Sequence, residues 1–232
     1  MCSARIKPKS PGSAFSTAPG GKPCWVRGDV PASRSGCRVE DVGAGPGYAT
    51  WDLAEVVGAA GTVVAVERSP RFSAELRREA AARCLGQVRV LEGDLMELAP
   101  LEACDMAWCR WVASFVPSIV TLVGWLRESV RPAGRVVLHE YLDYGSWRFA
   151  PPRPALQAFV AEVMASWRGS GGEPDAAGPL ICELRRNGFR VLSTRPHVFT
   201  TAPGELTCQW PAAFVAANPI GCTSWDGYPP SG

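Results

Sequence analysis

One short stretch restricts the fold of this chain more than any other. It begins with the strand-like residues 37–42, turns through the glycines Gly43, Gly45 and Gly47, and continues into a helix-forming segment at 48–57. This order of strand, glycine turn and helix brings backbone N–H groups and a helix N-terminus up to a ligand. If the turn binds a ligand, the rest of the chain has to supply a parallel sheet that holds it.

The segments that follow alternate between strand and helix, as such a sheet requires. Strands are expected at residues 37–42, 62–66, 88–91, 105–109 and 136–139, with helices between them at 48–57, 70–85 and 119–130. The alternation predicts an α/β fold with a doubly wound, mostly parallel Rossmann-like sheet, helices on both faces and right-handed crossovers.

The remaining pattern is less regular. It predicts helices at residues 156–167, 179–187 and 206–217, and a sixth strand at 189–192 with residues 197–200 as its extension or partner. No strong strand candidate follows residue 205. We therefore expect a sheet that is incomplete at its C-terminal edge.

Length and charge suggest one folded domain with tails. A chain of 232 residues accommodates one α/β domain, which we place at residues 37–217. Residues 1–36 are rich in Ser, Pro, Gly and basic side chains, which predicts a disordered basic leader, and residues 218–232 are expected to be an unstructured tail. Residues 1–38 carry a net charge of +6 and the remainder −4, so a nucleic-acid surface on the folded part is not expected.

The cysteines and the hydropathy restrict the compartment. Nine cysteines occur, an odd number without any CxxC pair, which favours reduced thiols over a disulfide framework or a zinc site. No apolar run is long enough to span a membrane, and the N-terminus lacks the apolar segment of a secretory signal. We expect a cytoplasmic protein without a bound metal.

Two acids mark the ends of the second and third predicted strands. Ligands of open α/β sheets bind outside the carboxyl ends of the strands, where strand order reverses. Glu67 follows Gly43 by 24 residues, about the distance at which an acid meets ribose hydroxyls in nucleotide-binding units. Asp94, one strand further on, is placed to accept a hydrogen bond from an adenine amino group. A glycine loop together with both acids is much more specific than the loop alone.

The spacing of the loop argues against a nicotinamide dinucleotide. That fingerprint is GxGxxG, with Gly or Ala at its sixth position so that helix and strand can pack closely. Here Tyr48 takes the sixth position, and the third glycine comes one residue early, after Pro46. S-adenosylmethionine has no pyrophosphate to bind and fits this loop better.

On these residues the chain resembles the class I S-adenosylmethionine-dependent methyltransferases, of the small-molecule type grouped with ubiquinone and menaquinone biosynthesis. The matching motifs are DVGAGPG at 41–47, VAVE at 64–67, EGDL at 92–95, CRW at 109–111 and RPAGR at 131–135. The resemblance covers residues 37–217 and is stronger in the first half than after residue 145.

The resemblance implies S-adenosylmethionine as cofactor and assigns its contacts. The amino-acid part of the cofactor would lie against the loop residues Asp41, Gly43, Ala44, Gly45 and Gly47, with Asp41 as their anchor. Glu67 would hold the ribose, Arg68 would lie against the adenine, and Asp94 with Leu95 would bind the adenine edge. Arg110 would face the methionine end or the substrate.

Aromatic residues after the fourth and fifth strands are candidates for the substrate pocket. They are Trp111, Tyr141, Tyr144 and Trp147, and packing of a loop is the alternative role for Tyr144 and Trp147. A general base is needed only if the acceptor loses a proton during attack. His139 and Tyr141 are the candidates, although a core histidine is the favoured interpretation of His139.

These features predict methyl transfer from S-adenosylmethionine to a small-molecule acceptor by in-line displacement. The first alternative is a non-catalytic binding module of the same fold. It is motivated by Glu40, which would bury a charge in the central strand, and by atypical segments at both ends of the domain. A nicotinamide-dependent oxidoreductase is the third hypothesis.

Overall fold

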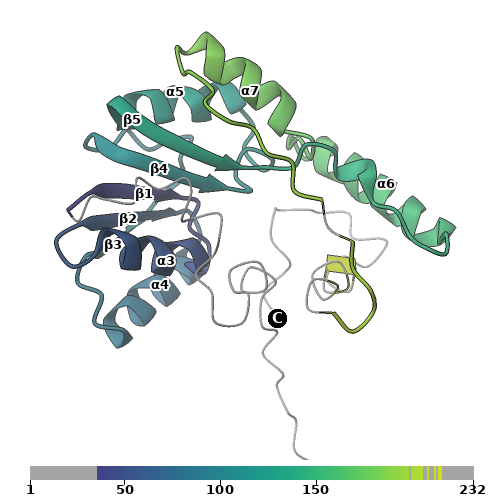
Figure 1. Ribbon diagram of the computed structural model, residues 1–232, viewed down its shortest axis with the longest axis horizontal. Helices are drawn as coiled ribbons and strands as arrows, with labels where there is room; N and C mark the ends of the chain where they lie inside the picture. The colour runs from purple at the N-terminus through teal and green to yellow at the C-terminus, as the bar shows by residue number, and fades with distance from the viewer. Residues whose placement is uncertain (1–35, 199, 206–207, 209–211, 213, 216–232) are drawn as a thin grey trace, which may run out of the picture.

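A five-stranded parallel sheet organises the computed structural model, which describes residues 36–198, 200–205, 208, 212, 214 and 215. The strands are β1 (Arg38–Val42), β2 (Thr62–Glu67), β3 (Val88–Glu92), β4 (Cys104–Arg110) and β5 (Val130–His139). Their order in the sheet is β3-β2-β1-β4-β5, with every neighbouring pair parallel (Figure 1). The doubly wound sheet is confirmed, and the strand order reverses between β1 and β4.

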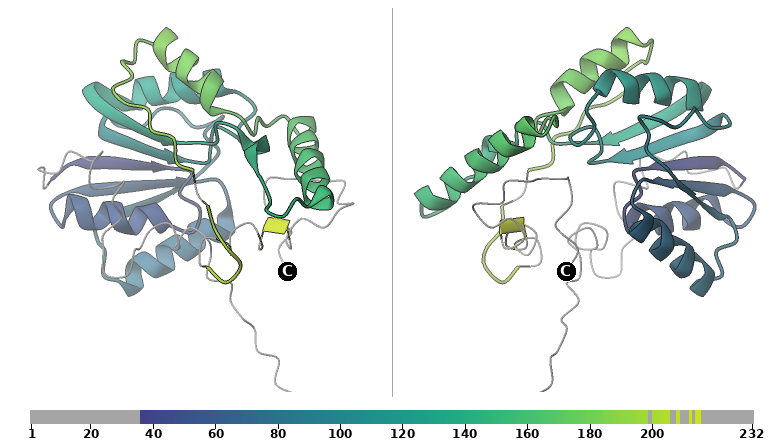
Figure 2. Two further views of the ribbon diagram at one scale, coloured as in Figure 1. Left: turned by 45° about the vertical axis from the view of Figure 1, so that its right-hand side comes forward. Right: turned by 180° about the vertical axis from the view of Figure 1, so that it is seen from behind.

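Helices cover both faces of this sheet (Figures 1 and 2). One face carries α3 (Tyr48–Val57) and α4 (Pro70–Ala82), and the other carries α5 (Ile119–Ser129) and α7 (Ala177–Arg186). The long helix α6 (Pro154–Gly169) follows the short 3₁₀ turn η1 (Tyr144–Ser146) and extends beyond the sheet. No helix in the described part of the chain combines the length and apolar content needed to cross a membrane.

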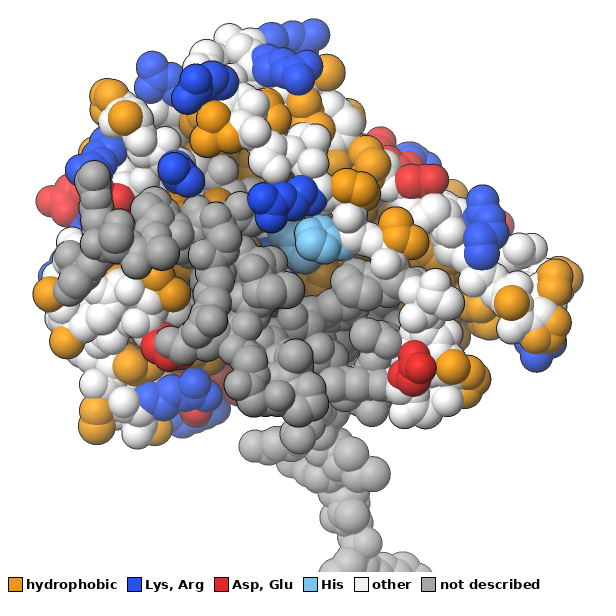
Figure 3. Space-filling model, viewed as in Figure 1, with side chains coloured by type: hydrophobic (Ala, Val, Ile, Leu, Met, Phe, Trp, Pro, Cys, Tyr) orange, Lys and Arg blue, Asp and Glu red, His pale blue; other side chains and the backbone are white. Residues whose placement is uncertain are grey.

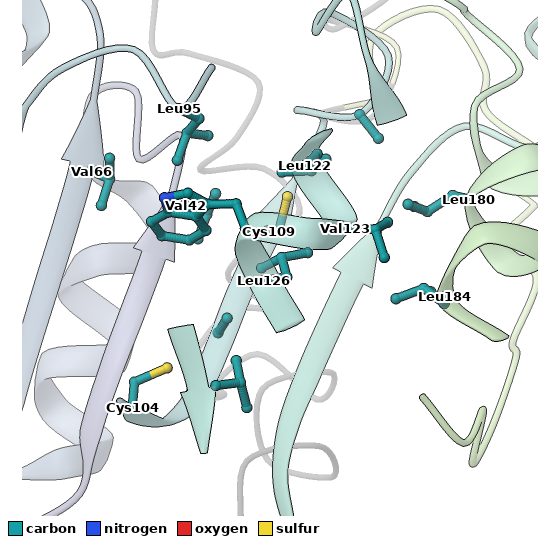
Figure 4. Packing of buried hydrophobic residues seen from close by; sticks show 14 of the residues in the cluster. Val42, Val66, Leu95, Cys104, Cys109, Leu122, Val123, Leu126, Leu180 and Leu184 are labelled. Carbon is teal, nitrogen blue, oxygen red and sulfur yellow. The ribbon is translucent and has the colours of Figure 1, made fainter. Parts of the chain in front are cut away.

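The inner strands β1, β2 and β4 are buried on both faces because alternate side chains enter two separate cores. Val42 and Cys109 face α5, whose Leu122 and Leu126 point towards them (Figure 4). Leucines of α7 pack behind that helix. On the opposite face Val39 packs against α3. Continuous burial of this kind explains the unbroken β-branched runs of the sequence.

The predicted sixth strand at 189–192 and its extension or partner at 197–200 are not found among the described residues. Residues 189–192 form no strand, and residues 193–198 continue as irregular chain. Phe189 packs on the core, but Leu192 is 63% exposed and Pro196 cannot donate to a ladder, so this segment lacks the two-sided burial of an inner strand. The predicted helix at 206–217, the leader and the tail lie largely or wholly outside the described residues.

The boundary between α5 and β5 also differs from the prediction. The helix ends at Ser129 and the strand starts at Val130. The sequence Pro-Ala-Gly at 132–134 predicts a turn instead, with the strand beginning at residue 136. Val130 pairs with Cys104 across an irregular register, and Ala133 takes a left-handed conformation with φ of 64°. A bulged first half therefore replaces the expected turn.

Glu40 is buried in the central strand, as the sequence indicated. Its side chain is fully inaccessible, and neither carboxylate oxygen has a hydrogen-bond partner within the described part of the chain. Burial raises the pKa of Glu40 from 4.5 to about 7, although the neighbouring Cys104 thiol and Arg38 guanidinium favour the charged form. The carboxylate thus destabilises the fold, and it lies on the α5 side of β1 rather than at the glycine loop.

Replacing Glu40 with leucine is expected to stabilise the protein. A pKa of about 7 in place of 4.5 corresponds to roughly 3 kcal/mol in favour of the protonated form. The wild-type protein keeps this stability below pH 4.5 and loses it as the pH rises to about 7, so the advantage of Glu40→Leu should grow over that range and then level off. Urea unfolding at several pH values measures it, with Glu40→Gln as the isosteric control. A Glu40→Leu protein that is no more stable at about pH 8 than the wild type would contradict the assignment.

Candidate functional site

The glycine loop connects β1 to α3 in a conformation that depends on left-handed backbone. Gly43, Gly45 and Gly47 have φ values of 67°, 55° and 89°, a region that side chains disfavour. The loop is fixed by the Ala44 N–H, which donates to the carbonyl of Val66 on the neighbouring strand at 2.9 Å. A Cβ on Gly43 would overlap Val112, whereas one on Gly45 would meet nothing within 4 Å. There is thus open space on the side of Gly45 where a side chain would lie.

The carboxylate of Glu67 holds this loop from the end of β2. Its Oε2 accepts a hydrogen bond from the Gly45 N–H at 2.7 Å, and its Oε1 accepts one from the Ser69 N–H at 2.7 Å. The Gly93 N–H donates to the backbone carbonyl of Glu67 at 3.0 Å. Glu67 is only 2% exposed and joins the loop, the start of α4 and the end of β3. Each carboxylate oxygen can accept a second hydrogen bond, so a ligand hydroxyl can share it.

Asp41 ties β1, the strand before the glycine loop, to α3. Its Oδ2 accepts a hydrogen bond of 2.6 Å from the Thr50 hydroxyl, and both side chains are buried. Burial raises the pKa of Asp41 to about 6, while Thr50 and the charge of Arg110 lower it. This bond fixes the helix behind the loop, and it depends on a threonine that the sequence did not single out.

The adenine-side candidates follow the carboxyl ends of β2 and β3. Arg68 is exposed directly after β2. Asp94 caps a turn, since its Oδ1 accepts from the Met96 N–H at 2.9 Å and its carbonyl from the Leu98 N–H at 2.8 Å. Leu95 is 8% exposed and packs in the core. The structure brings these residues to one edge of the sheet, and their roles towards adenine stay predictions.

Arg110 lies at the reversal of strand order, at the end of β4. Its guanidinium is 4.9 Å from the ring centroid of Trp111, and strand register pairs it with His139. Burial lowers the pKa of Arg110, and Asp41 and Tyr141 oppose that effect electrostatically. A positive charge therefore stands between the loop anchor and the aromatic residues.

The four predicted pocket residues form one continuous series of ring contacts. Trp111 and Tyr141 stack with centroids 5.6 Å apart and planes 5° apart. Tyr141 meets the edge of Tyr144 at 4.9 Å, and Tyr144 lies 5.8 Å from Trp147. Tyr144 is 2% exposed and also packs on Trp167 at 5.4 Å. Trp111 and Tyr141 thus lie at the strand ends, whereas Tyr144 belongs to the interior of the cluster.

Neither candidate base titrates near neutral pH. Burial, together with the charge of Arg110 and the nearby His197, lowers the pKa of His139 to about 4. Burial raises the pKa of Tyr141 well above its ordinary value. The two histidine rings are 5.7 Å apart, and Figure 3 shows histidine side chains beside hydrophobic and basic ones. At neutral pH His139 is an uncharged imidazole with low proton affinity.

One residue of this region was not selected from the sequence. Glu140 accepts hydrogen bonds from the N–H groups of Val112 and Ala113, both at 2.8 Å, and from the Ser114 hydroxyl at 3.2 Å. An acid directly after a strand end was the available signal, as it was for Glu67. The partners of Glu140 are 26 to 28 residues away in sequence, so the contact is purely tertiary.

Alanine at Gly43 should destabilise the protein more than alanine at Gly45. Both positions are left-handed, which costs an alanine about 1–2 kcal/mol, but only the Gly43 Cβ overlaps Val112. We expect a loss of roughly 1 kcal/mol at Gly45 and about 2–4 kcal/mol at Gly43. Urea unfolding of Gly43→Ala, Val112→Ala and the double variant should reveal coupling, because the shortened Val112 relieves the overlap. Strict additivity of the two changes would refute this explanation.

Comparison with known proteins identifies the family. A family model described as a methyltransferase domain matches residues 39–134. Nocamycin O-methyltransferase of Saccharothrix syringae is 32% identical over 69% of this chain and 62% of its own. Aklanonic acid methyltransferase DauC of Streptomyces sp. strain C5 is 26% identical over 60% of this chain and 66% of its own. This chain therefore spans less than two thirds of either relative.

A third relative matches more completely. Trans-aconitate 2-methyltransferase of Azoarcus sp. strain BH72 is 30% identical over 83% of this chain and 79% of its own. Among solved structures, the [4+2]-cyclase SpnF superposes with a TM-score of 0.55 at 20% identity, over 72% of this chain and 56% of that one. Identity at that level supports the fold alone, and the ubiquinone-type subgroup stays a prediction. The sequence relatives and the site geometry together show that this chain belongs to the class I S-adenosylmethionine-dependent methyltransferases.

Proposed function

We propose that this protein transfers a methyl group from S-adenosylmethionine to an oxygen atom of a small-molecule acid. The observation that carries the proposal is the glycine loop held by Glu67 at the point where strand order reverses. Three relatives support an acceptor of this class, since each is named after a small molecule: nocamycin O-methyltransferase, aklanonic acid methyltransferase and trans-aconitate 2-methyltransferase. In the last two names the molecule is an acid or its anion.

The residues of the loop fit the cofactor. A Cβ at Gly45 would meet nothing within 4 Å, so the amino-acid part of the cofactor would approach the loop at this position. Glu67 retains lone pairs for the ribose hydroxyls. Arg68, Asp94 and Leu95 lie at the adjoining strand ends, where the adenine would be held. Asp41 acts behind the loop by fixing α3 through Thr50.

The bound cofactor supplies a methyl group on a sulfonium, which an acceptor takes by in-line displacement. The chain's own contribution is binding, orientation and exclusion of water. Holding the acceptor in line can lower the barrier by several kcal/mol without a covalent intermediate. Trp111 and Tyr141 provide a rigid apolar surface for that purpose, because their rings stack on each other and on neighbouring aromatic residues.

The site favours an acceptor that is already deprotonated. An efficient general base has a pKa near the working pH. The pKa of His139 is lowered to about 4, and the pKa of Tyr141 is raised well above the ordinary value of a tyrosine. A carboxylic acid has lost its proton at neutral pH and needs no base. Arg110 adds a positive charge that attracts such an anion.

Calorimetric titration with S-adenosylhomocysteine and NADH tests the cofactor. We expect S-adenosylhomocysteine to bind and NADH not to bind. Glu67→Gln should weaken S-adenosylhomocysteine roughly 10- to 100-fold, because a charge-assisted hydrogen bond is lost. An analogue without ribose hydroxyls should lose most of this sensitivity to the substitution. NADH binding alone would exclude a methyltransferase, and no binding of any ligand would favour the non-catalytic module.

A methyl-ester assay tests the acceptor class. Protein and methyl-labelled S-adenosylmethionine are incubated with trans-aconitate or a polycyclic aromatic carboxylic acid, each beside its carboxamide as control. We expect alkali-labile label from an acid and none from the matching amide, because only the carboxylate presents a deprotonated oxygen at neutral pH. Alkali-stable label, or equal labelling of acid and amide, would exclude the proposed ester formation.

A further inference from the structure

We infer that Glu140 is a positioning residue that fixes the loop between β4 and α5, residues 111–118. It thereby couples the glycine loop at 43–47, called the cofactor loop below, to the aromatic cluster, which consists of Trp111, Tyr141, Tyr144, Trp147 and Trp167. The inference rests on the proposed function for its catalytic meaning. The contact itself is a feature of the fold and can be tested without an acceptor.

The carboxylate of Glu140 occupies a site formed by backbone donors. Its Oε1 accepts from the consecutive N–H groups of Val112 and Ala113, each at 2.8 Å, and its Oε2 accepts from the Ser114 hydroxyl at 3.2 Å. These residues begin a single turn, since the Phe115 and Val116 N–H groups both donate to the Val112 carbonyl at 2.9 and 3.2 Å. Successive N–H groups at the start of a turn attract an anion, and here the chain supplies its own.

The residue before this turn is held in a strained conformation. Trp111 has a φ of 57°, which a bulky residue adopts only when its surroundings impose it. Its N–H donates to the His139 carbonyl at 3.0 Å, and the next two N–H groups bind Glu140. Three successive donors are thus bound by two adjacent residues at the end of β5. This arrangement fixes the backbone at Trp111, whose ring stacks on Tyr141.

The same loop contacts both halves of the site. Val112 packs so closely on Gly43 that a Cβ there would overlap it. The Ser114 carbonyl accepts from Trp167 Nε1 at 2.8 Å and from the Glu173 N–H at 3.0 Å. A shift of this loop would therefore displace the cofactor loop on one side and the aromatic cluster on the other.

Amide hydrogen exchange, measured by NMR, tests the contact. In Glu140→Leu the Val112 and Ala113 amides should exchange roughly 10- to 100-fold faster than in the wild type, while Glu140→Gln, which keeps an acceptor oxygen, should retain most of the protection. Glu183→Leu is the matched control, because Glu183 is 9% exposed and binds Asn187 at 2.8 Å on α7. Wild-type exchange at Val112 and Ala113 in Glu140→Leu, or equal acceleration in Glu183→Leu, would overturn the inference.

A pH titration covers the case in which Glu140→Leu does not fold. Burial raises the pKa of Glu140 to about 7, so the amide shifts of Val112 and Ala113 should titrate together near neutral pH in the wild type and not in Glu140→Gln. Cys109 and Tyr141 face Glu140, and burial raises the pKa of both well above this range. The same titration persisting in Glu140→Gln would reject Glu140 as the acceptor of these bonds.

Cofactor affinity distinguishes positioning from general stability. We expect Glu140→Leu to weaken S-adenosylhomocysteine about 10-fold through Val112 and Gly43, with Glu140→Gln close to wild type and Glu183→Leu within about twofold. Equal weakening by Glu140→Leu and Glu183→Leu would reduce Glu140 to a stabilising role and overturn the inference. A wild-type protein that binds no S-adenosylhomocysteine would sink the proposed function, while amide exchange would still decide whether Glu140 holds the loop.

Discussion

The hydrogen bonds from two backbone N–H groups to the buried carboxylate of Glu67 hold the ligand-binding edge of this fold together. Gly45 and Ser69 donate to opposite oxygens, so the β1–α3 loop and the start of α4 are bound to one group at the end of β2. The loop can take this course only because its glycines tolerate left-handed backbone. A buried charge requires such partners, and here the partners are the groups that shape the site.

Glu140 repeats this device on the other side of the reversal in strand order. Each carboxylate lies at the end of a strand and accepts from backbone N–H groups of a loop distant in sequence, from Gly45 for Glu67 and from Val112 and Ala113 for Glu140. Glu67 holds the half that contains the glycine loop, and Glu140 holds the half that contains the aromatic residues. Val112 joins the two halves, since it is held by Glu140 and packs on Gly43. Two buried carboxylates that accept hydrogen bonds from backbone N–H groups thus fix the loops on the two sides of this reversal.

The sequence was most informative where local pattern and tertiary environment coincide. The inner strands β1, β2 and β4 are buried on both faces, so their apolar runs and the glycine turn identified them. After residue 140 the sequence pattern no longer predicts the strands correctly. Residues 189–192 have a strand-like composition but lack burial on both faces. The sequence singled out Trp111 and Tyr141 by their position at strand ends, where the structure places them, and their pocket role stays a prediction. Thr50 and Glu140 were not, since their importance arises from contacts with residues distant in sequence.

Glu40 lowers the stability of the fold without disturbing the contacts of the glycine loop. Its carboxylate is buried without a hydrogen-bond partner among the residues that the structure describes, and its pKa of about 7 means that folding favours the protonated form. Alternation along β1 directs Glu40 to the α5 side, whereas Asp41 faces α3 and the loop anchor. The unfavourable group therefore acts on global unfolding, and its neighbours at the site keep their hydrogen bonds. Glu40 consequently gives no structural reason to regard the cofactor loop as defective.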